Sequence, residues 1–358
     1  METANKNGSI IKEKIKMKFN VKNFSKKVVS KIASSSILPP ITAGLILAIT
    51  FSVILLAGCG KKEGTTTLNM SEDAANKVYV PPGQYDEFYS FISGGFSGQL
   101  AVYGLPSGRL FRVIPVFSVD PEKGWGYTEE TKPMLMTSSG FIPWDDSHHT
   151  ELSMTDGVPN GKWIFINGNN TPRLARIDLK TFRTVEILES AGNHSSPFTT
   201  ENSEYVVCGT RFSIPMKELD VPIDSYREKF NGTVSFVKIN PESGNMNVEF
   251  QILTPPFDYD LSHAGKGPSH DWFFFSCYNT EEAYTLLEVN ASQKDKDFIM
   301  AVNWKKAEQY LKEGKAKDMA SEFYHNVYDE SKHSATSEVL KTVKMLDPKD
   351  CPDMIYYI

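Results

Sequence analysis

Two neighbouring histidines beside two carboxylates give the clearest chemical signal in the sequence, in the segment WDDSHH at 144–149. Imidazole nitrogens bind transition metals, and a carboxylate such as Asp146 can hold an imidazole in one tautomer and orientation. Adjacent side chains on a regular strand face opposite sides. We therefore expect His148 and His149 to serve one site only from a loop, or by binding different metals of a cluster. A solvated loop with no ligand would also explain the pair, and the residues alone leave both interpretations open.

A third histidine, His194, lies in AGNHSSPF at 191–198 and by itself indicates an ordinary loop histidine. The sequence contains no nucleophile elbow, phosphate loop or dinucleotide-binding fingerprint. Chemistry that needs those motifs is therefore not indicated.

Short strand-like runs separated by turn residues must position these histidines. Three hairpins are predicted, pairing 99–103 with 110–117, 163–166 with 174–177, and 234–239 with 246–253. A phrase of strand, Asp or Asn turn, and strand begins near 176, 238 and 345, and it is typical of the outer hairpin of a propeller blade. One helix is predicted from Trp304 to about Lys315. The fold class predicted is all-β, of the β-propeller type.

The N-terminus predicts export. A lysine-rich stretch precedes an apolar run at 37–56, which ends in LAGC with Cys59 last. This order is typical of a lipoprotein signal at 1–59, with Cys59 acylated, followed by a flexible tether at 60–77 and the folded domain at 78–358. An uncleaved transmembrane helix is the alternative, since about twenty apolar residues can span a bilayer. Either way the domain is expected in the periplasm, anchored to a membrane.

Length, charge and cysteines limit the remaining possibilities. The 358 residues suffice for one large or two ordinary domains, and the formal charge of −6 includes many lysines before residue 32. The rest of the chain is too acidic to favour a nucleic-acid partner. Three further cysteines show neither a disulfide framework nor a zinc-binding spacing, so each is expected in the core: Cys208, Cys277 and Cys351.

Several motifs together resemble the Sec-exported, lipoprotein-type branch of the nitrous-oxide reductases. They are YDEFY at 85–89, SGGFSG at 93–98, VYGLPSGR at 102–109, PMLM at 133–136, DSHH at 146–149, NGNNTPR at 167–173, AGKGPSH at 264–270 and LLEVNAS at 286–292. The resemblance runs over 78–358 and covers only the N-terminal portion of such a protein. It implies a seven-bladed β-propeller, incomplete here, which in the family is followed by a cupredoxin domain.

The resemblance also implies a reaction and its cofactor. In the family, a tetranuclear copper-sulfide centre held by seven histidines reduces nitrous oxide to dinitrogen, the last step of denitrification. His148, His149 and His194 match three of those ligands, and copper favours imidazole. Asp146 and Asp260 match carboxylates near the cluster. The other histidines match no ligand motif and are expected to be structural: His263, His270, His325 and His333.

Other parts of the implied enzyme lie outside this sequence. The remaining copper ligands, and the dinuclear copper centre of the cupredoxin domain, are among them. Electrons are expected from a c-type cytochrome or similar donor, and the complete protein is expected to be a homodimer. Because 355–358 ends within an apolar run, we expect the chain to be a fragment that is inactive alone.

A structural calcium ion is implied as well. Tyr278 and Val289 match backbone-carbonyl donors of the family's site, and Glu281 and Asp295 match its carboxylates. Val289 stands where other members have methionine, which a carbonyl ligand tolerates.

A different class of function stays open at this stage. A lipid-anchored periplasmic β-propeller can also act as a binding scaffold without catalysis, because propellers host many functions.

Overall fold

The computed structural model describes residues 74–137, 140–215, 222, 225–278, 298–319, 324–329, 334–339 and 342–358. Contacts divide the chain into two compact units, Met1–Ser71 and Glu72–Ile358, and every described residue lies in the second. The predicted signal with Cys59 and the calcium residues Glu281, Val289 and Asp295 lie outside the described residues. In the described part of the chain, no helix is both long and apolar enough to cross a membrane.

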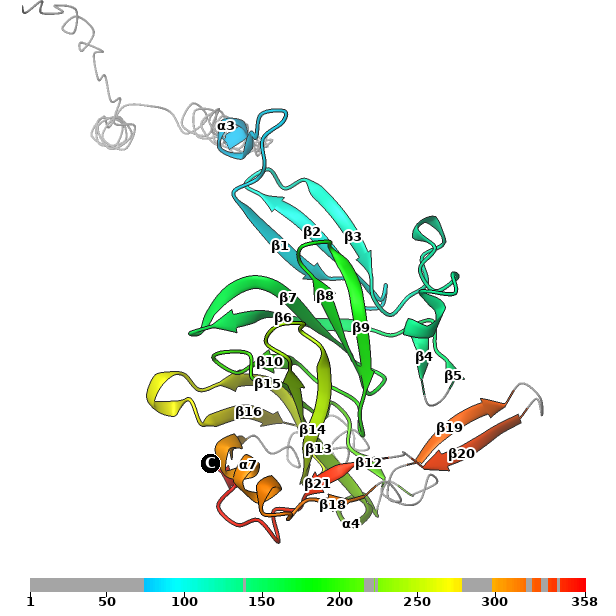
Figure 1. The fold of residues 1–358 in the computed structure, drawn as a ribbon, viewed down its shortest axis with the longest axis vertical. Coiled ribbons are helices and arrows are strands. Elements are labelled where there is room, and N and C mark those ends of the chain that lie inside the picture. Colours follow the sequence, from blue (N-terminus) through cyan, green and yellow to red (C-terminus); the bar gives the residue numbers. More distant parts are fainter. Residues whose placement is uncertain are drawn as a thin grey trace, which may run out of the picture. The chain divides into compact units, whose positions relative to one another are not determined.

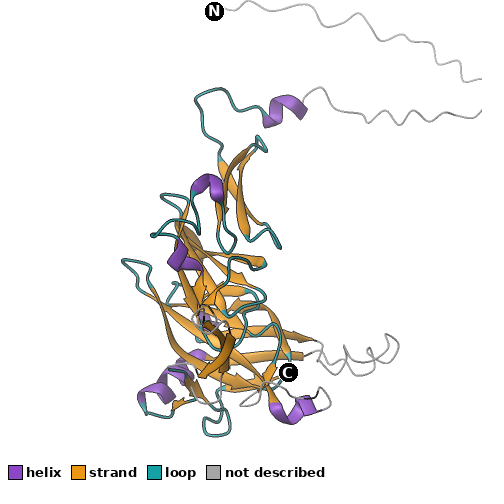
Figure 2. Cartoon of the chain, turned by 90° about the vertical axis from the view of Figure 1, so that its right-hand side faces the viewer, coloured by secondary structure: helices purple, strands orange, loops and turns teal. Residues whose placement is uncertain are grey.

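Strands dominate the described residues, and helices are short and few (Figure 2). Most strands belong to successive antiparallel meanders, which follow one another along the chain (Figure 1). The first sheet contains β1 (Phe88–Ser93), β2 (Gln99–Leu105) and β3 (Leu110–Pro115). The second contains β6 (Ser147–Thr155), β7 (Val158–Gly168), β8 (Arg173–Asp178) and β9 (Arg183–Glu189).

The third sheet runs β10 (Pro197–Thr199), β11 (Tyr205–Gly209), β13 (Phe230–Ile239), β14 (Met246–Thr254), β21 (Lys344–Leu346) and β18 (Lys317–Asp318), with β12 (Ile214–Pro215) beside β13. The fourth contains β15 (Asp258–Ala264), β16 (Trp272–Tyr278), β17 (Phe298–Asn303) and β22 (Ile355–Tyr357). Two small ribbons pair β4 (Met136–Thr137) with β5 (Gly140–Phe141) and β19 (Tyr324–Asp329) with β20 (Ser334–Val339). The helices are α3 (Ala74–Val78), α4 (Tyr226–Lys229) and α7 (Trp304–Lys312).

The first strands of the successive sheets lie next to one another. Strand β6 contacts both β1 and β10, and β15 contacts β10 and β11. Radial sheets whose first strands meet on the inside are the arrangement of a β-propeller. The predicted all-β fold of the propeller type is confirmed, and the number of blades in a complete ring stays a prediction.

Apolar layers fill the space between neighbouring sheets. Leu100 and Val102 of the first sheet pack with Ile164 of the second. Phe165 of the second packs with Val206 and Cys208 of the third. The largest cluster joins the third and fourth sheets and includes Tyr205, Phe236, Phe250, Phe273, Phe275, Met300 and Trp304. Each large side chain buried in this way contributes roughly 1.5–3 kcal/mol.

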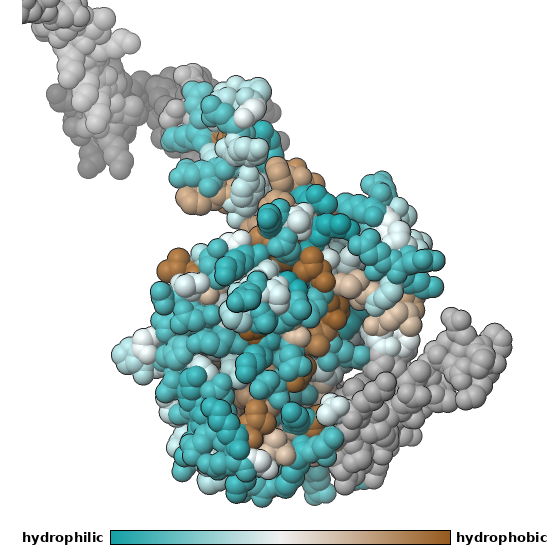
Figure 3. Space-filling view, viewed as in Figure 1, coloured by the Kyte–Doolittle hydropathy of each residue, from teal (hydrophilic) through white to brown (hydrophobic). Residues whose placement is uncertain are grey.

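The polar surface of the domain and the burial of its cysteines are consistent with these apolar layers. The face in Figure 3 is mostly hydrophilic, with hydrophobic residues along its middle. Cys208, Cys277 and Cys351 are free thiols and buried, as predicted, and burial raises the pKa of each.

The three predicted hairpins are present as β2–β3, β7–β8 and β13–β14. The predicted helix is α7, which Asn303 caps by accepting a hydrogen bond from Lys306 N at 2.9 Å. The third strand-turn-strand phrase was interpreted wrongly, because β21 forms no hairpin with the strand after it. Strand β21 pairs with β14 and β18, whereas β22 pairs with β17 in another sheet. Cys351 and Met354, which lie between β21 and β22 in the chain, are buried in the largest core cluster. Their burial takes the chain from the third sheet to the fourth.

Candidate metal centre

A β-bulge places both neighbouring histidines at one point of the first strand of the second sheet. Ser147 pairs with Gly168 and Thr150 with Ile166, so His148 and His149 together face one residue of β7. Their ring centroids lie 4.4 Å apart, with the ring planes nearly perpendicular at 89°. The bulge differs from both expected arrangements, a loop or ligation of separate metals, and no residue of the motif marks it in the sequence.

Asp146 lies beside the first of these imidazoles. Its Oδ2 is 3.3 Å from Nδ1 of His148 and accepts a hydrogen bond from Asn169 Nδ2, also at 3.3 Å. Its Oδ1 is buried, and no described residue forms a hydrogen bond with it. Contact with Nδ1 of His148 leaves the other ring nitrogen, Nε2, for a metal.

A buried ion pair fixes the segment that leads into the histidines. Asp145 and Arg173 are 0% and 1% exposed in their side chains, and Arg173 Nη2 lies 3.3 Å from Asp145 Oδ2. Asp145 Oδ1 also accepts the backbone N–H of Asp146 at 2.8 Å and of Asn170 at 3.0 Å. Arg173 further donates to the carbonyl of Trp144 at 3.0 Å. Both residues lie within motifs of the sequence, but nothing in those motifs indicates that they pair.

One buried amide joins the histidine pair to His194. Asn167, the residue opposite the bulge, is 0% exposed. Its Oδ1 accepts the backbone N–H of His149 at 2.9 Å, and its Nδ2 donates to the carbonyl oxygen of His194 at 3.0 Å. The backbones of two predicted ligands from different sheets are therefore held by a single side chain.

His194 precedes β10, the first strand of the third sheet, and its side chain is buried. Nε2 lies 2.6 Å from Ser190 Oγ, and Nδ1 has no hydrogen-bond partner among the residues described. Burial lowers the pKa of His194 to about 4, and the backbone of Arg173 partly opposes that shift. The imidazole is neutral at pH 7, the form in which it can bind a metal.

Asp260 approaches the pair from β15, the first strand of the fourth sheet. Its Oδ1 accepts hydrogen bonds from Ser195 Oγ at 2.6 Å and Ser196 Oγ at 2.7 Å. Burial alone raises the pKa of Asp260, but these and other hydrogen bonds outweigh it and lower the pKa to about 2. The carboxylate, 3.9 Å from Nε2 of His149, is therefore ionised at neutral pH.

The charge state of His149 follows from the same surroundings. Burial lowers its pKa, and the neighbouring His148 lowers it further, whereas Asp260 acts in the opposite direction. A lowered pKa favours the neutral imidazole that a metal requires.

These donors suit copper in their chemistry. Imidazole is a good copper ligand, and Nδ1 of His194 is a ligand atom that has no hydrogen-bond partner in the part of the chain that the structure describes. Among the residues that the structure describes, no three His, Cys, Asp or Glu side chains are already arranged to hold a metal ion. The copper assignment of His148, His149 and His194 stays a prediction.

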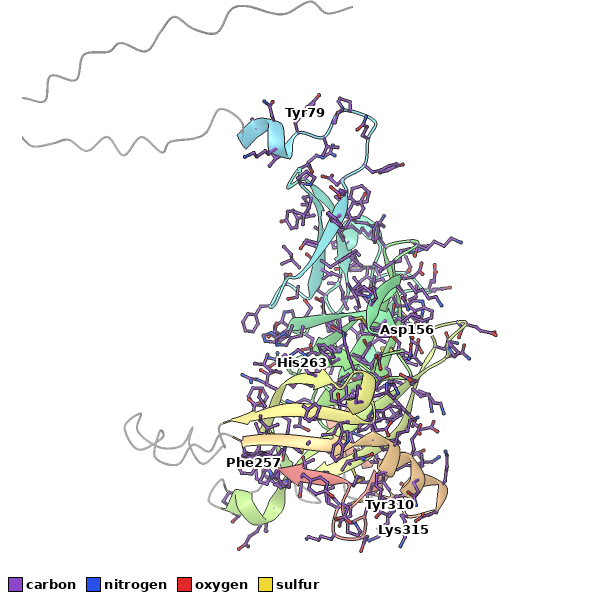
Figure 4. The ribbon with its side chains drawn as sticks, turned by 90° about the vertical axis from the view of Figure 1, so that its left-hand side faces the viewer. Tyr79, Asp156, Phe257, His263, Tyr310 and Lys315 are labelled. Atoms are coloured by element: carbon purple, nitrogen blue, oxygen red, sulfur yellow. The ribbon has the colours of Figure 1, made fainter. Side chains whose placement is uncertain are left out.

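The other described histidine side chains lie in different surroundings. His263, on β15 in Figure 4, has its ring 4.6 Å from that of Phe198. His270 lies between two carboxylates, with Nδ1 3.0 Å from Glu201 and Nε2 3.3 Å from Glu204. Of His325 only the backbone is described, in β19, and His333 lies outside the described residues.

Comparison with known proteins finds curated relatives of this sequence, although no family model matches it. The chain is 32% identical over 254 residues to the nitrous-oxide reductase of Pseudomonas fluorescens, covering 68% of this chain and 37% of that protein. It is 32% identical over 232 residues to the nitrous-oxide reductase of Stutzerimonas stutzeri, covering 63% and 34%. Among solved structures, Kuenenia stuttgartiensis hydrazine synthase has a TM-score of 0.38 at 10% identity, covering 60% of this chain and 47% of that one.

The match to the curated relatives is partial along their length. The chain spans little more than a third of either reductase. Within that span, the resemblance that the motifs predicted is confirmed: this chain is a relative of the nitrous-oxide reductases and corresponds to a portion of them.

Proposed function

We propose that this chain is part of an enzyme that reduces nitrous oxide to dinitrogen at a histidine-held copper-sulfide centre. His148, His149 and His194 are its contribution to the ligands. The observation that carries the proposal is the arrangement around Asn167, whose side chain joins the backbone N–H of His149, in the second sheet, to the backbone carbonyl of His194, just before the third. The relatives' name gives the reaction, and the donor chemistry agrees with it.

In this proposal nitrous oxide takes up two electrons and two protons to give dinitrogen and water. A bound copper centre would supply the electrons and polarise an otherwise inert substrate. The side chains of His148 and His149 are 39% and 36% exposed, so solutes reach them. Asp146 lies beside Nδ1 of His148, and the ionised Asp260 provides negative charge beside His149.

The remaining components of the enzyme are part of the same proposal. They are the other copper ligands, the dinuclear copper centre, a c-type cytochrome or similar electron donor, and a homodimer. None of the described contacts favours the alternative of a non-catalytic binding scaffold, and copper analysis separates the two functions.

The test uses the protein that carries this chain, purified from its native source. We expect copper in the protein and consumption of nitrous oxide with a reduced viologen as electron source. The double variant His148→Ala/His149→Ala should lose at least 100-fold in activity and most of its copper, because ligands of one cluster act together. His263→Ala, a histidine on a neighbouring first strand, is the control and should retain both. A copper-free wild type, or full activity in the double variant, would contradict the proposal.

We propose also that Cys59 carries lipid and anchors the domain in the periplasm. The support is the order of basic stretch, apolar run and LAGC in the sequence. Cys59→Ala should release the protein from the membrane fraction or change its processing, which fractionation after osmotic shock and the mass of the chain measure. Unchanged processing together with retention in the membrane would instead indicate an uncleaved transmembrane helix.

The calcium site stays a proposal as well. Its residues are Tyr278, at the end of β16, and Glu281, Val289 and Asp295 outside the described part. Oxygen donors of this kind suit a hard cation. We expect bound calcium in elemental analysis and a lower melting temperature after chelation, with Asp295→Ala reproducing the loss. A purified protein without calcium would contradict this assignment.

A further inference from the structure

Buried hydroxyl groups hold the imidazole of His194 from one side. Ser190, directly after β9, places its Oγ 2.6 Å from Nε2 of His194, and its backbone N–H donates to the carbonyl of Pro172 at 3.0 Å. Both side chains are almost fully buried. The short contact therefore has no competition from water, and it restricts rotation of the ring.

A second layer of buried polar groups restrains Ser190 in turn. The hydroxyl oxygen of Ser235, on β13, lies 3.4 Å from the hydroxyl oxygen of Ser190, which is long for a hydrogen bond. Gln251, on β14, donates to Ser235 Oγ at 2.7 Å and to the carbonyl of Ala191 at 2.8 Å. Its Oε1 accepts the N–H of Ala191 at 3.2 Å. The segment around Ser190 is thus fixed to two strands of the third sheet.

The position of the ring proton follows from which nitrogen has a partner. Nε2 faces Ser190, and Nδ1 is buried without a hydrogen-bond partner among the described residues. Although the backbone of Arg173 favours a protonated ring, no described acceptor has hydrogen-bond geometry to Nδ1, so a proton there would be on a buried, unsatisfied N–H, which costs about 1–3 kcal/mol. With the proton on Nε2, Ser190 Oγ accepts it and Nδ1 keeps a lone pair.

We infer that Ser190 is a positioning residue of the metal centre. It accepts the Nε2–H of His194, selects that tautomer and orientation, and leaves Nδ1 as the nitrogen that binds metal. The metal part of this inference rests on the proposed function, whereas the tautomer does not. A ligating histidine with its other ring nitrogen held by a fixed partner is a general way to orient a ligand, and loss of that partner typically weakens metal binding 10- to 100-fold.

Two measurements on the full chain test this inference. The first is ¹⁵N NMR of the metal-free, histidine-labelled protein, with His194→Gln used to assign the resonance. We expect wild-type His194 to have its proton on Nε2, and Ser190→Ala to show a mixture of tautomers. The second is titration with Cu²⁺ alone, in which Ser190→Ala should bind 10- to 100-fold more weakly and show altered nitrogen couplings by electron paramagnetic resonance.

Control variants separate positioning from general stability. Ser190→Thr keeps a hydroxyl and should restore much of the affinity. Thr184→Val removes another buried hydroxyl, one that donates to the carbonyl of Pro115 and contacts neither His194 nor the segment around Ser190, and should leave tautomer and affinity unchanged. The wild-type tautomer can be measured even if Ser190→Ala does not fold.

The outcomes distinguish this inference from the proposed function. A wild-type proton on Nδ1 overturns the inference, as does a Ser190→Ala protein with unchanged tautomer and Cu²⁺ affinity, and neither result affects the copper function. A wild type with the expected tautomer that binds no Cu²⁺ supports the positioning by Ser190 and counts against the copper function.

Discussion

Replacing Arg173 with methionine is expected to lower the free energy of unfolding by about 3–5 kcal/mol, because it leaves the buried carboxylate of Asp145 without its counter-ion. Neither side chain of this pair is more than 1% exposed. The variant also loses the hydrogen bonds from Arg173 to the carbonyls of Ile142 and Trp144 and its contact over the Phe117 ring, 5.0 Å from the centroid. Urea unfolding of the full chain, followed by tryptophan fluorescence, measures the change.

An exposed ion pair gives the matched control for Arg173. Lys238 and Glu249 lie 3.5 Å apart with side chains 53% and 29% exposed, so Lys238→Met should cost no more than about 1 kcal/mol. Removing Asp145 together with Arg173 should recover only part of the loss, since Asp145 also accepts backbone N–H groups. If Arg173→Met and Lys238→Met destabilise the chain equally, the buried pair does not fix the histidine segment.

Asn167→Ala is expected to weaken both folding and Cu²⁺ binding. Two backbone groups would lose their partner, the N–H of His149 and the carbonyl of His194, at about 1–3 kcal/mol each if water does not replace it. The link between the histidine pair and His194 is lost with them, and we expect roughly 10- to 100-fold weaker Cu²⁺ binding. Urea unfolding and copper titration of the same protein measure the two effects.

Asn160→Ala is the control for the second prediction. Asn160 also uses both ends of its amide, accepting from Ser153 and donating to Met154, but in the hairpin between β6 and β7. Asp156, in the turn of this hairpin, is labelled in Figure 4. This variant should lose stability without losing Cu²⁺ affinity. Equal affinities of wild type and Asn167→Ala would show that the amide bridge does not set the spacing of the ligands.

The hairpins were predictable from sequence because their turns are local. Asn240 accepts the N–H groups of Glu242 and Ser243, and Gly244 has a φ of 77°, so PESG and its neighbours specify the turn without help from distant residues. The pairing of β21 with β14 was not predictable, because it joins strands about ninety residues apart through a parallel contact that no local pattern encodes.

The candidate site likewise contains some residues that the sequence indicates and others that only the packing of the sheets reveals. His148, His149 and His194 stand out by residue type, and the family motifs point to them. The bulge is a matter of register between β6 and β7, and the roles of Asn167, Arg173 and Ser190 depend on partners from other strands or loops. Such partners come together only through the packing of sheets, which single-sequence patterns do not fix.

The bulge in β6 also determines what a change of chain length would do. Both histidines lie opposite one residue of β7, so a one-residue deletion at His148 or His149 would convert the bulge into regular pairing. Ser147 would still pair with Gly168 and Thr150 with Ile166, so the flanking residues would keep their faces, but one imidazole would remain where there are now two. The number of residues between Ser147 and Thr150 is therefore as much a requirement of this site as their identity.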